Sequence, residues 1–209
     1  AGAPLYLTLV QLSRAPSSYT PVILLLILTV GTGLYSAAAA RTLEQNLADR
    51  IRYGGGADVM LEQVWEYTID PDGTQVQLVE PPWQLHYDLP GVVHPARVRM
   101  QEIIPQVAGR NQRKSTLMAI DPEDFAHVAW FRRDLFDAHP YAYLNLLLAD
   151  EEAVLVSRDF LSRHRLAPGD RITLVGERQE EVSLVVFAAL DYWPSLYPER
   201  GDFFIANLD

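Results

Sequence analysis

Several features that would mark an enzyme or a cofactor-binding protein are missing from this sequence of 209 residues. It has no cysteine, which excludes a disulfide scaffold, a thiolate metal site and a cysteine nucleophile. It also lacks the GxxxxGK(S/T) and GxGxxG phosphate loops, the HExxH zinc motif and the GxSxG nucleophile turn. We therefore expect no catalytic residue, no cofactor and no metal site in this chain.

The histidines and the net charge exclude further classes. None of the five histidines has the spacing of a metal site, so we expect them to be solvated surface residues. They are His86, His94, His127, His139 and His164. The formal net charge of -10 at pH 7 argues against a nucleic-acid partner, because binding to phosphates requires clustered Lys and Arg.

Acidic side chains are absent from the first 41 residues, in which Arg14 and Arg41 are the only charged residues. The other 168 residues hold 15 basic and 27 acidic side chains, a net charge of -12. Between the two arginines, residues 21–40 form an uncharged run of twenty residues without a polar stripe. As an α-helix this run would be roughly 30 Å long, the thickness of a bilayer core. The pattern predicts a transmembrane helix over 21–41, in contact with membrane lipid.

Two other interpretations of the uncharged run stay open. A secretory signal peptide is suggested by the small residues 38–40, although the run exceeds the usual apolar region of about 7–15 residues. A fully buried helix in a larger assembly is the second. On the membrane interpretation, Thr29, Gly33 and Ala37 follow one another at a spacing of four. They would line one helix face and allow close packing of a partner helix.

The chain beyond the span has the pattern of an α+β domain. Leu43, Leu47 and Ile51 recur at a spacing of four, which predicts a stalk helix over 42–56 that ends at its three glycines. Short strands and helices then alternate over 57–209.

Turn and cap residues place several of these elements. Alternation predicts a strand from Ala57 to Ile69, and the turn Asp70–Gly73 predicts that it forms a hairpin with 74–79. Strands are also predicted over 97–107, 115–120, 153–157, 171–175, 182–190 and 203–206. Helices are predicted after Asp121, over 141–148 and over 158–165.

Candidate functional residues in this domain are few. Trp193 and Tyr197 lie in an aromatic loop that offers a possible partner or ligand surface, with core packing as the alternative. A single-span anchored sensor or ligand-binding module would use that loop. An anchored hydrolase using Asp121, Asp124 and His127 is a further hypothesis, although helix capping accounts for the two aspartates.

The order of several segments resembles the FtsX-like permease family, the membrane subunits of MacB-type ABC transporters. The segments are LTLVQLSRAPSSYT, RTLEQNLADRIRYGGGADV, LPGV (89–92), LMAIDPEDFAHVAWF (117–131), VLVSRDFLSRHRLAPGDRITL (154–174) and DYWPSLYPERGDFFIANLD (191–209). The most telling block is VLVS, a short helix, then GD and ITL, which is similar to the late part of the MacB-like core domain. These motifs mark a fold and not a catalytic centre.

The resemblance implies a non-catalytic transporter subunit. Residues 1–20 would be a cytoplasmic or interfacial lead, with Leu5, Leu9 and Leu12 on the membrane surface or on a separate ABC ATPase subunit. Residues 57–209 would be an incomplete MacB-like extracytoplasmic core domain, with the chain in the cell membrane beside a second permease copy or homologue. The family continues into three further spans, so we expect this chain to be a fragment.

Charge near the span disagrees with that topology. Arg14 precedes the span, and Arg41, Arg50 and Arg52 follow it. A positive-inside count alone would place the large domain in the cytoplasm. We follow the resemblance and expect an extracytoplasmic domain. The transported substrate is not encoded in any short motif of this sequence.

Overall fold

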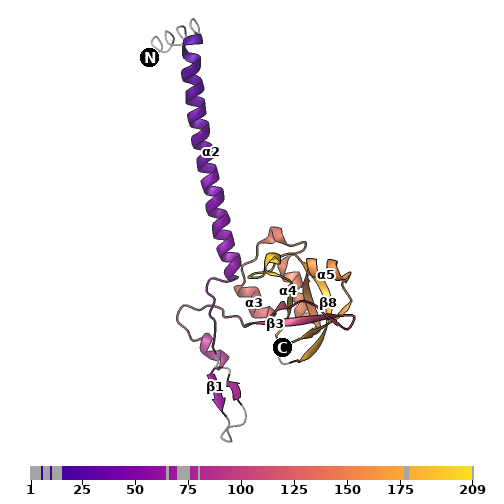
Figure 1. Cartoon of the computed structure of the whole chain (residues 1–209). Coiled ribbons are helices and arrows are strands. Elements are labelled where there is room, and N and C mark those ends of the chain that lie inside the picture. Colours follow the sequence, from indigo (N-terminus) through magenta and orange to yellow (C-terminus); the bar gives the residue numbers. More distant parts are fainter. Residues whose placement is uncertain are drawn as a thin grey trace. The chain divides into compact units, whose positions relative to one another are not determined.

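The computed structural model describes residues 6, 10, 16–64, 66–69, 76–79, 81–176 and 179–208 (Figure 1). Leu5, Leu9, Leu12 and the Asp70–Gly73 turn lie outside these residues. The chain forms two compact units, Ala1–Arg50 and Ile51–Asp209.

The first unit is built on helix α2 (Pro16–Gly55), a single α-helix of 40 residues. Its most apolar window has a mean hydropathy of 2.1, and none of the residues in that window is buried. Exposed Val, Ile and Leu side chains cover all sides of this part of the helix. By length and composition, α2 can cross a membrane.

The second unit is a mixed α and β domain, as the sequence predicts in this coarser form. Its strands are β1 (Glu66–Ile69), β2 (Val76–Val79), β3 (Val98–Val107), β4 (Arg110–Asn111), β5 (Ser115–Ile120), β6 (Ala153–Ser157), β7 (Arg171–Val175), β8 (Glu181–Leu190) and β9 (Phe203–Asn207). Its helices are α3 (Pro122–Val128), α4 (Pro140–Ala149) and α5 (Arg158–His164), with 3-10 turns η1 (Trp83–His86), η2 (Arg133–Leu135) and η3 (Pro198–Arg200). Strands β1 and β2 pair as a separate two-stranded antiparallel sheet.

The main sheet closes on itself, which the sequence did not predict. Its strand order is β4-β3-β5-β9-β6-β8-β7, and β3 also pairs with β7 through Ile104↔Val175 and Pro105↔Leu174. The sheet is therefore barrel-like, with the two-residue strand β4 attached to β3. Closure removes most of the free strand edges that an open sheet would expose.

Closure creates an inner core. Side chains from every strand of the closed ring meet in one buried cluster, and helix α5 adds Phe160 and Leu161 to it. The strand residues are Ile103, Leu117, Val154, Val156, Ile172, Leu174, Leu184, Val186, Phe204 and Ala206. Strand β7 alternates between exposed or half-buried and buried residues, as a strand with one buried face should.

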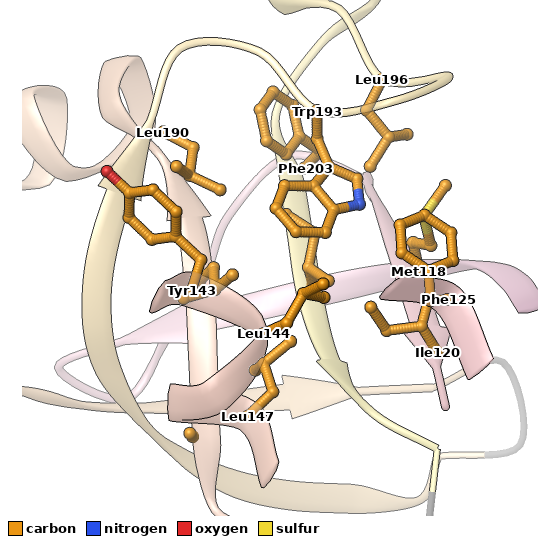
Figure 2. Packing of buried hydrophobic residues seen from close by; sticks show 13 residues of the cluster. Met118, Ile120, Phe125, Tyr143, Leu144, Leu147, Leu190, Trp193, Leu196 and Phe203 are labelled. Carbon is orange, nitrogen blue, oxygen red and sulfur yellow. The ribbon is translucent and has the colours of Figure 1, made fainter. Parts of the chain in front are cut away.

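A second, outer core covers the other face of β5, β9 and β6 (Figure 2). Helices α3 and α4 and the loop after β8 supply its cover through Phe125, Leu144, Leu147 and Trp193. Strand β6 is consequently buried at all five of its positions. Two-sided burial explains why Ala153–Ser157 has no alternating pattern in the sequence.

Most of the predicted elements are present, with one clear error. The structure confirms the strands at 98–107, 115–120, 153–157, 171–175, 181–190 and 203–207, the β1–β2 pairing, and the helix end at the glycine run. The predicted strand from Ala57 to Ile69 is wrong over 57–64, which has no regular secondary structure. The apolar side chains of Val59, Leu61 and Val64 are all exposed, so no core face selects a strand there.

The inner core predicts that truncating two valines to alanine will have very different effects on the stability of the domain. Val156 in β6 is 0% exposed, whereas Val182 in β8 is 52% exposed. We expect Val156→Ala to lower the free energy of unfolding by about 2 kcal/mol, because it removes two buried methyl groups and leaves a cavity. The matched Val182→Ala change should cost less than about 0.5 kcal/mol. Urea unfolding of the full chain in detergent micelles, followed by tryptophan fluorescence, measures both. Equal losses of unfolding free energy in the two variants would contradict the burial of Val156 inside the closed sheet.

Candidate functional site: the last turn of the long helix

The last turn of α2, Ile51–Gly55, belongs to the second unit and is joined to its core. The Ser195 backbone N–H donates to the Tyr53 carbonyl oxygen at 2.8 Å. The Trp130 N–H donates to the Gly56 carbonyl oxygen at 2.9 Å. Two loops far apart in the sequence thus donate to backbone carbonyl groups three positions apart at the helix end. We call Tyr53, Gly56, Trp130, Ser195 and Tyr197 the helix-end junction.

Tyr53 is the central side chain of the helix-end junction. It is 3% exposed, and its ring makes edge contacts with Trp130 at 6.2 Å and with Tyr197 at 5.8 Å between ring centres. Its buried hydroxyl has no hydrogen-bond partner among the described residues. Tyr53 is thus held by apolar and aromatic contacts and not by a polar network.

Gly56 fits a position where a side chain would be strained. Its φ is +73°, and its N–H donates to the Arg52 carbonyl oxygen at 2.8 Å, which closes the helix. A Cβ atom built on Gly56 would lie 2.8 Å from the Ser195 hydroxyl oxygen. Ser195 itself has a φ of +69°. The close approach of these two turns therefore depends on glycine at position 56.

Trp193 does not offer the predicted ligand surface. Its side chain is 0% exposed and stacks on Phe125 at 5.8 Å and 5° (Figure 2). Its ring also contacts Phe131 and Phe136 edge-on. The core-packing alternative is correct for this residue, because α3 and the segment after it cover the indole. Trp193 anchors the loop that carries Ser195 to the helix end.

Tyr197 is half-buried and serves the same junction. Its ring contacts Tyr53, and the Arg200 guanidinium lies 5.4 Å from the ring centre. The Tyr197 hydroxyl would be 3.4 Å from a Cβ on Gly54. The aromatic loop is thus a support for the helix end and not an open binding face. A sensor that binds its ligand through both aromatic side chains finds no support in this geometry.

The predicted helix-packing residues Thr29, Gly33 and Ala37 are exposed along α2. The Thr29 hydroxyl donates to the Leu25 carbonyl oxygen at 2.7 Å, so its polarity is satisfied within the helix. An added Cβ on Gly33 would meet nothing within 4 Å. These facts leave the packing face available to another helix, and its use stays a prediction.

Asp121, Asp124 and His127 do not form a hydrogen-bonded catalytic group. The Asp121 carboxylate accepts from the Glu123 and Asp124 N–H groups at 3.0 and 3.3 Å, which is the predicted helix cap. The His127 Nδ1 atom bonds to the Glu123 carbonyl oxygen at 3.0 Å. Burial, and then the charges of Asp121 and Glu123, raise the pKa of the Asp124 carboxyl.

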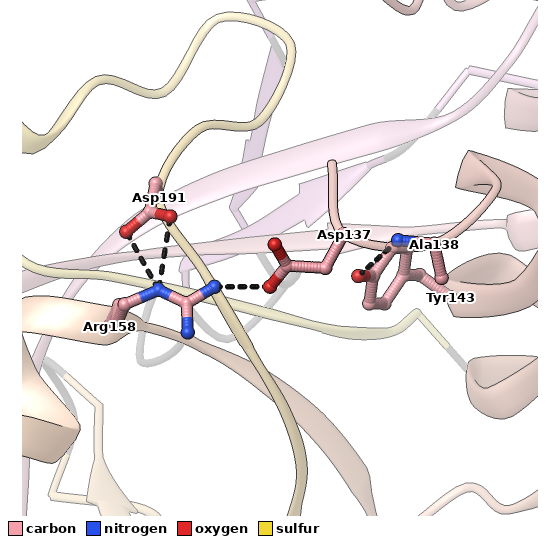
Figure 3. A network of polar contacts seen from close by, with 5 residues as sticks. All are labelled: Asp137, Ala138, Tyr143, Arg158 and Asp191. Atoms are coloured by element: carbon pink, nitrogen blue, oxygen red, sulfur yellow. Dashed lines mark hydrogen bonds and ion pairs between the residues drawn. The ribbon is translucent and has the colours of Figure 1, made fainter. Parts of the chain in front are cut away.

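A polar cluster around Arg158 was not found from the sequence (Figure 3). Its guanidinium donates to Asp137 at 2.6 Å and to Asp191 at 2.9 Å, and the hydrogen bond to Asp137 is the main cause of the raised pKa of Arg158. Asp137 and Asp191 are 21 and 33 residues away from Arg158 in the sequence, so no local motif predicts the cluster. It borders a cavity of about 360 Å³ that Asp134 and Asp159 also line. These exposed ion pairs join the start of α5 to the loop before α4 and to the loop after β8, at an energy of roughly 0–1 kcal/mol each.

No protein-family model matches the sequence, and no curated protein matches it either. The FtsX-like resemblance therefore stays a prediction from the segments quoted above.

The helix-end junction predicts opposite effects for two neighbouring glycines. We expect Gly56→Ala to lower the free energy of unfolding by about 1–2 kcal/mol, because alanine is strained at positive φ and its Cβ would contact Ser195. Gly55→Ala is the matched control: it is helical, and an added Cβ would meet nothing within 4 Å. That change should be neutral or stabilise by up to about 1 kcal/mol. Thermal unfolding of both variants tests whether position 56 requires glycine. Equal shifts of the unfolding midpoint in the two variants would contradict that requirement.

Proposed function

We propose that this chain is a fragment of an FtsX-like, MacB-type permease subunit of an ABC transporter. In this proposal α2 crosses the cell membrane, and the barrel-like domain lies on the extracytoplasmic side. ATP hydrolysis takes place on a separate subunit, because this sequence contains no phosphate loop. Movement of α2 displaces the outer domain during export or during the handling of a lipoprotein or peptide.

The observation that carries the proposal is the attachment of the helix end to the domain. A domain that only needed an anchor could follow its helix through a flexible linker of Gly and Ser. Here the last turn of α2 is itself part of the second unit and contains Tyr53, which is 3% exposed and lies between Trp130 and Tyr197. A shift of that turn must displace the aromatic contacts or move the domain with it.

The backbone contacts strengthen the same argument. The Ser195 N–H and the Trp130 N–H hold the carbonyl groups of Tyr53 and Gly56. Trp130 follows α3, and Ser195 follows the fully buried Trp193, so both donors are attached to the outer core. A displacement of the helix end therefore reaches the side of the domain that packs on β5, β9 and β6. This is the property that a force-transmitting permease domain requires.

The apolar part of α2 supports a membrane partner. Its residues are uncharged from 15 to 40, and none in the most apolar window is buried within this chain. Thr29, Gly33 and Ala37 give it a face of small side chains. In lipid, helices associate mainly by close packing of such faces. We place the second permease copy or homologue against this face.

Isolation of the native complex tests the proposal. The affinity-tagged full gene product, extracted from its own cells in mild detergent, should co-purify with a phosphate-loop ATPase and a second permease subunit. The isolated complex should hydrolyse ATP. Recovery of the tagged chain alone, from intact membranes and under several mild detergents, would contradict the proposal.

Two matched glycine variants test the helix face in the same experiment. Gly33→Ile places a branched side chain on the small-residue face, and we expect it to reduce recovery of the second permease subunit roughly fivefold, or about 1 kcal/mol. Gly31→Ile adds the same side chain two positions earlier, which is on a different side of the helix. An added Cβ at either glycine meets nothing within 4 Å in this chain. Equal recovery from both variants would remove Thr29, Gly33 and Ala37 from the interface.

A further inference from the structure

We propose that His94 and His127 form a chelating site for a divalent transition-metal ion such as Zn²⁺, which fastens the proline-rich loop 87–97 to helix α3. The two residues are 33 positions apart, and no sequence spacing links them. The fold brings their rings together at 5.2 Å between ring centres, with a tilt of 35°. This inference is independent of the transport proposal.

The ring separation suits shared coordination. Zinc binds imidazole nitrogen at about 2.0–2.1 Å, and two imidazoles on one tetrahedral ion have ring centres roughly 5 Å apart. Both side chains are exposed, so a metal ion can reach them without opening the domain. Each histidine also sits on a different segment, so one ion would join the loop to the helix.

The hydrogen bond of His127 selects the tautomer that metal binding requires. Its Nδ1 atom lies 3.0 Å from the Glu123 carbonyl oxygen. Because a carbonyl can only accept, Nδ1 must carry the proton, and the lone pair of the neutral ring is then on Nε2. A metal-binding histidine commonly donates its other N–H to a backbone carbonyl, which orients the ring and makes it a better ligand.

The surrounding charges favour a cation. Asp121, Glu123 and Asp124 stand in the cap and first turn of α3, one turn before His127. The Asp124 carboxylate is near enough to interact electrostatically with His127, and it accepts a hydrogen bond of 3.5 Å from the Tyr87 hydroxyl on the same loop as His94. A divalent cation at the two imidazoles would relieve the mutual repulsion of these three carboxylates.

The chemistry of the ligands limits which metal can bind. Among the described residues, no group of three or more His, Cys, Asp or Glu side chains is placed to hold an ion. The proposed site therefore has two imidazole ligands and open positions for water or for a donor from a partner. Imidazole suits Zn²⁺, Cu²⁺ and Ni²⁺, whereas Mg²⁺ and Ca²⁺ prefer oxygen ligands.

Calorimetric titration of the full chain with Zn²⁺, in detergent micelles and at neutral pH, tests the site. We expect one zinc ion per chain. Replacing either ligand, by His94→Ala or His127→Ala, should weaken binding at least about tenfold. The matched control His86→Ala should bind as the unchanged chain does, because His86 stacks on Trp83 and not on another histidine. Mg²⁺ should give no binding heat.

A second measurement keeps the test independent of folding. Without metal, the circular dichroism spectra of all three variants should match that of the unchanged chain, since the replaced side chains are exposed or half-buried. In the unchanged chain, Zn²⁺ should shift the ring resonances of two of the five histidines, with the metal on Nε2 of His127. The proposal is overturned if zinc does not bind, if His86→Ala weakens binding as much as the other two variants, or if neither His94→Ala nor His127→Ala weakens it.

Discussion

The burial of Tyr53 between Trp130 and Tyr197 is the contact on which the account of this molecule depends. It makes the last turn of a 40-residue helix part of the domain core. A residue of this size contributes several kcal/mol when it is fully buried, roughly 3–5 kcal/mol by truncation to alanine. Because the Tyr53 hydroxyl has no partner among the described residues, packing supplies this energy and not hydrogen bonding.

The loop after β8 connects this contact to the rest of the domain. Its buried Trp193 packs in the outer core, and two residues later the Ser195 N–H binds the Tyr53 carbonyl. The outer core covers strands that also form the wall of the closed sheet, so both cores share β5, β9 and β6. The short loop therefore connects the helix end to buried residues of the outer core.

Local features were predictable from the sequence, and non-local pairings were not. The uncharged run, the glycine stop and the Asp121 cap depend on neighbouring residues, and the structure places all three as expected. Closure through β3 and β7 depends on residues about 70 positions apart, and no local pattern specifies it. For Trp193 the sequence leaves a possible ligand surface and core packing both open, and the contact with Phe125 on a distant helix decides for core packing. His94 and His127 likewise meet only in the folded chain.

The central claim is that α2 spans the membrane and carries the domain on the extracytoplasmic side. It is tested most directly by measuring on which side of the membrane the domain lies. The chain has no cysteine, so an introduced cysteine is the only thiol that can react. Ser162→Cys lies at an exposed position of α5, and Ser17→Cys precedes the apolar run. With a membrane-impermeant maleimide on intact spheroplasts, we predict labelling of Ser162→Cys at once and of Ser17→Cys only after permeabilisation. The reverse order, or recovery of the labelled chain in the soluble fraction, would contradict a membrane-spanning α2 that carries an extracytoplasmic domain.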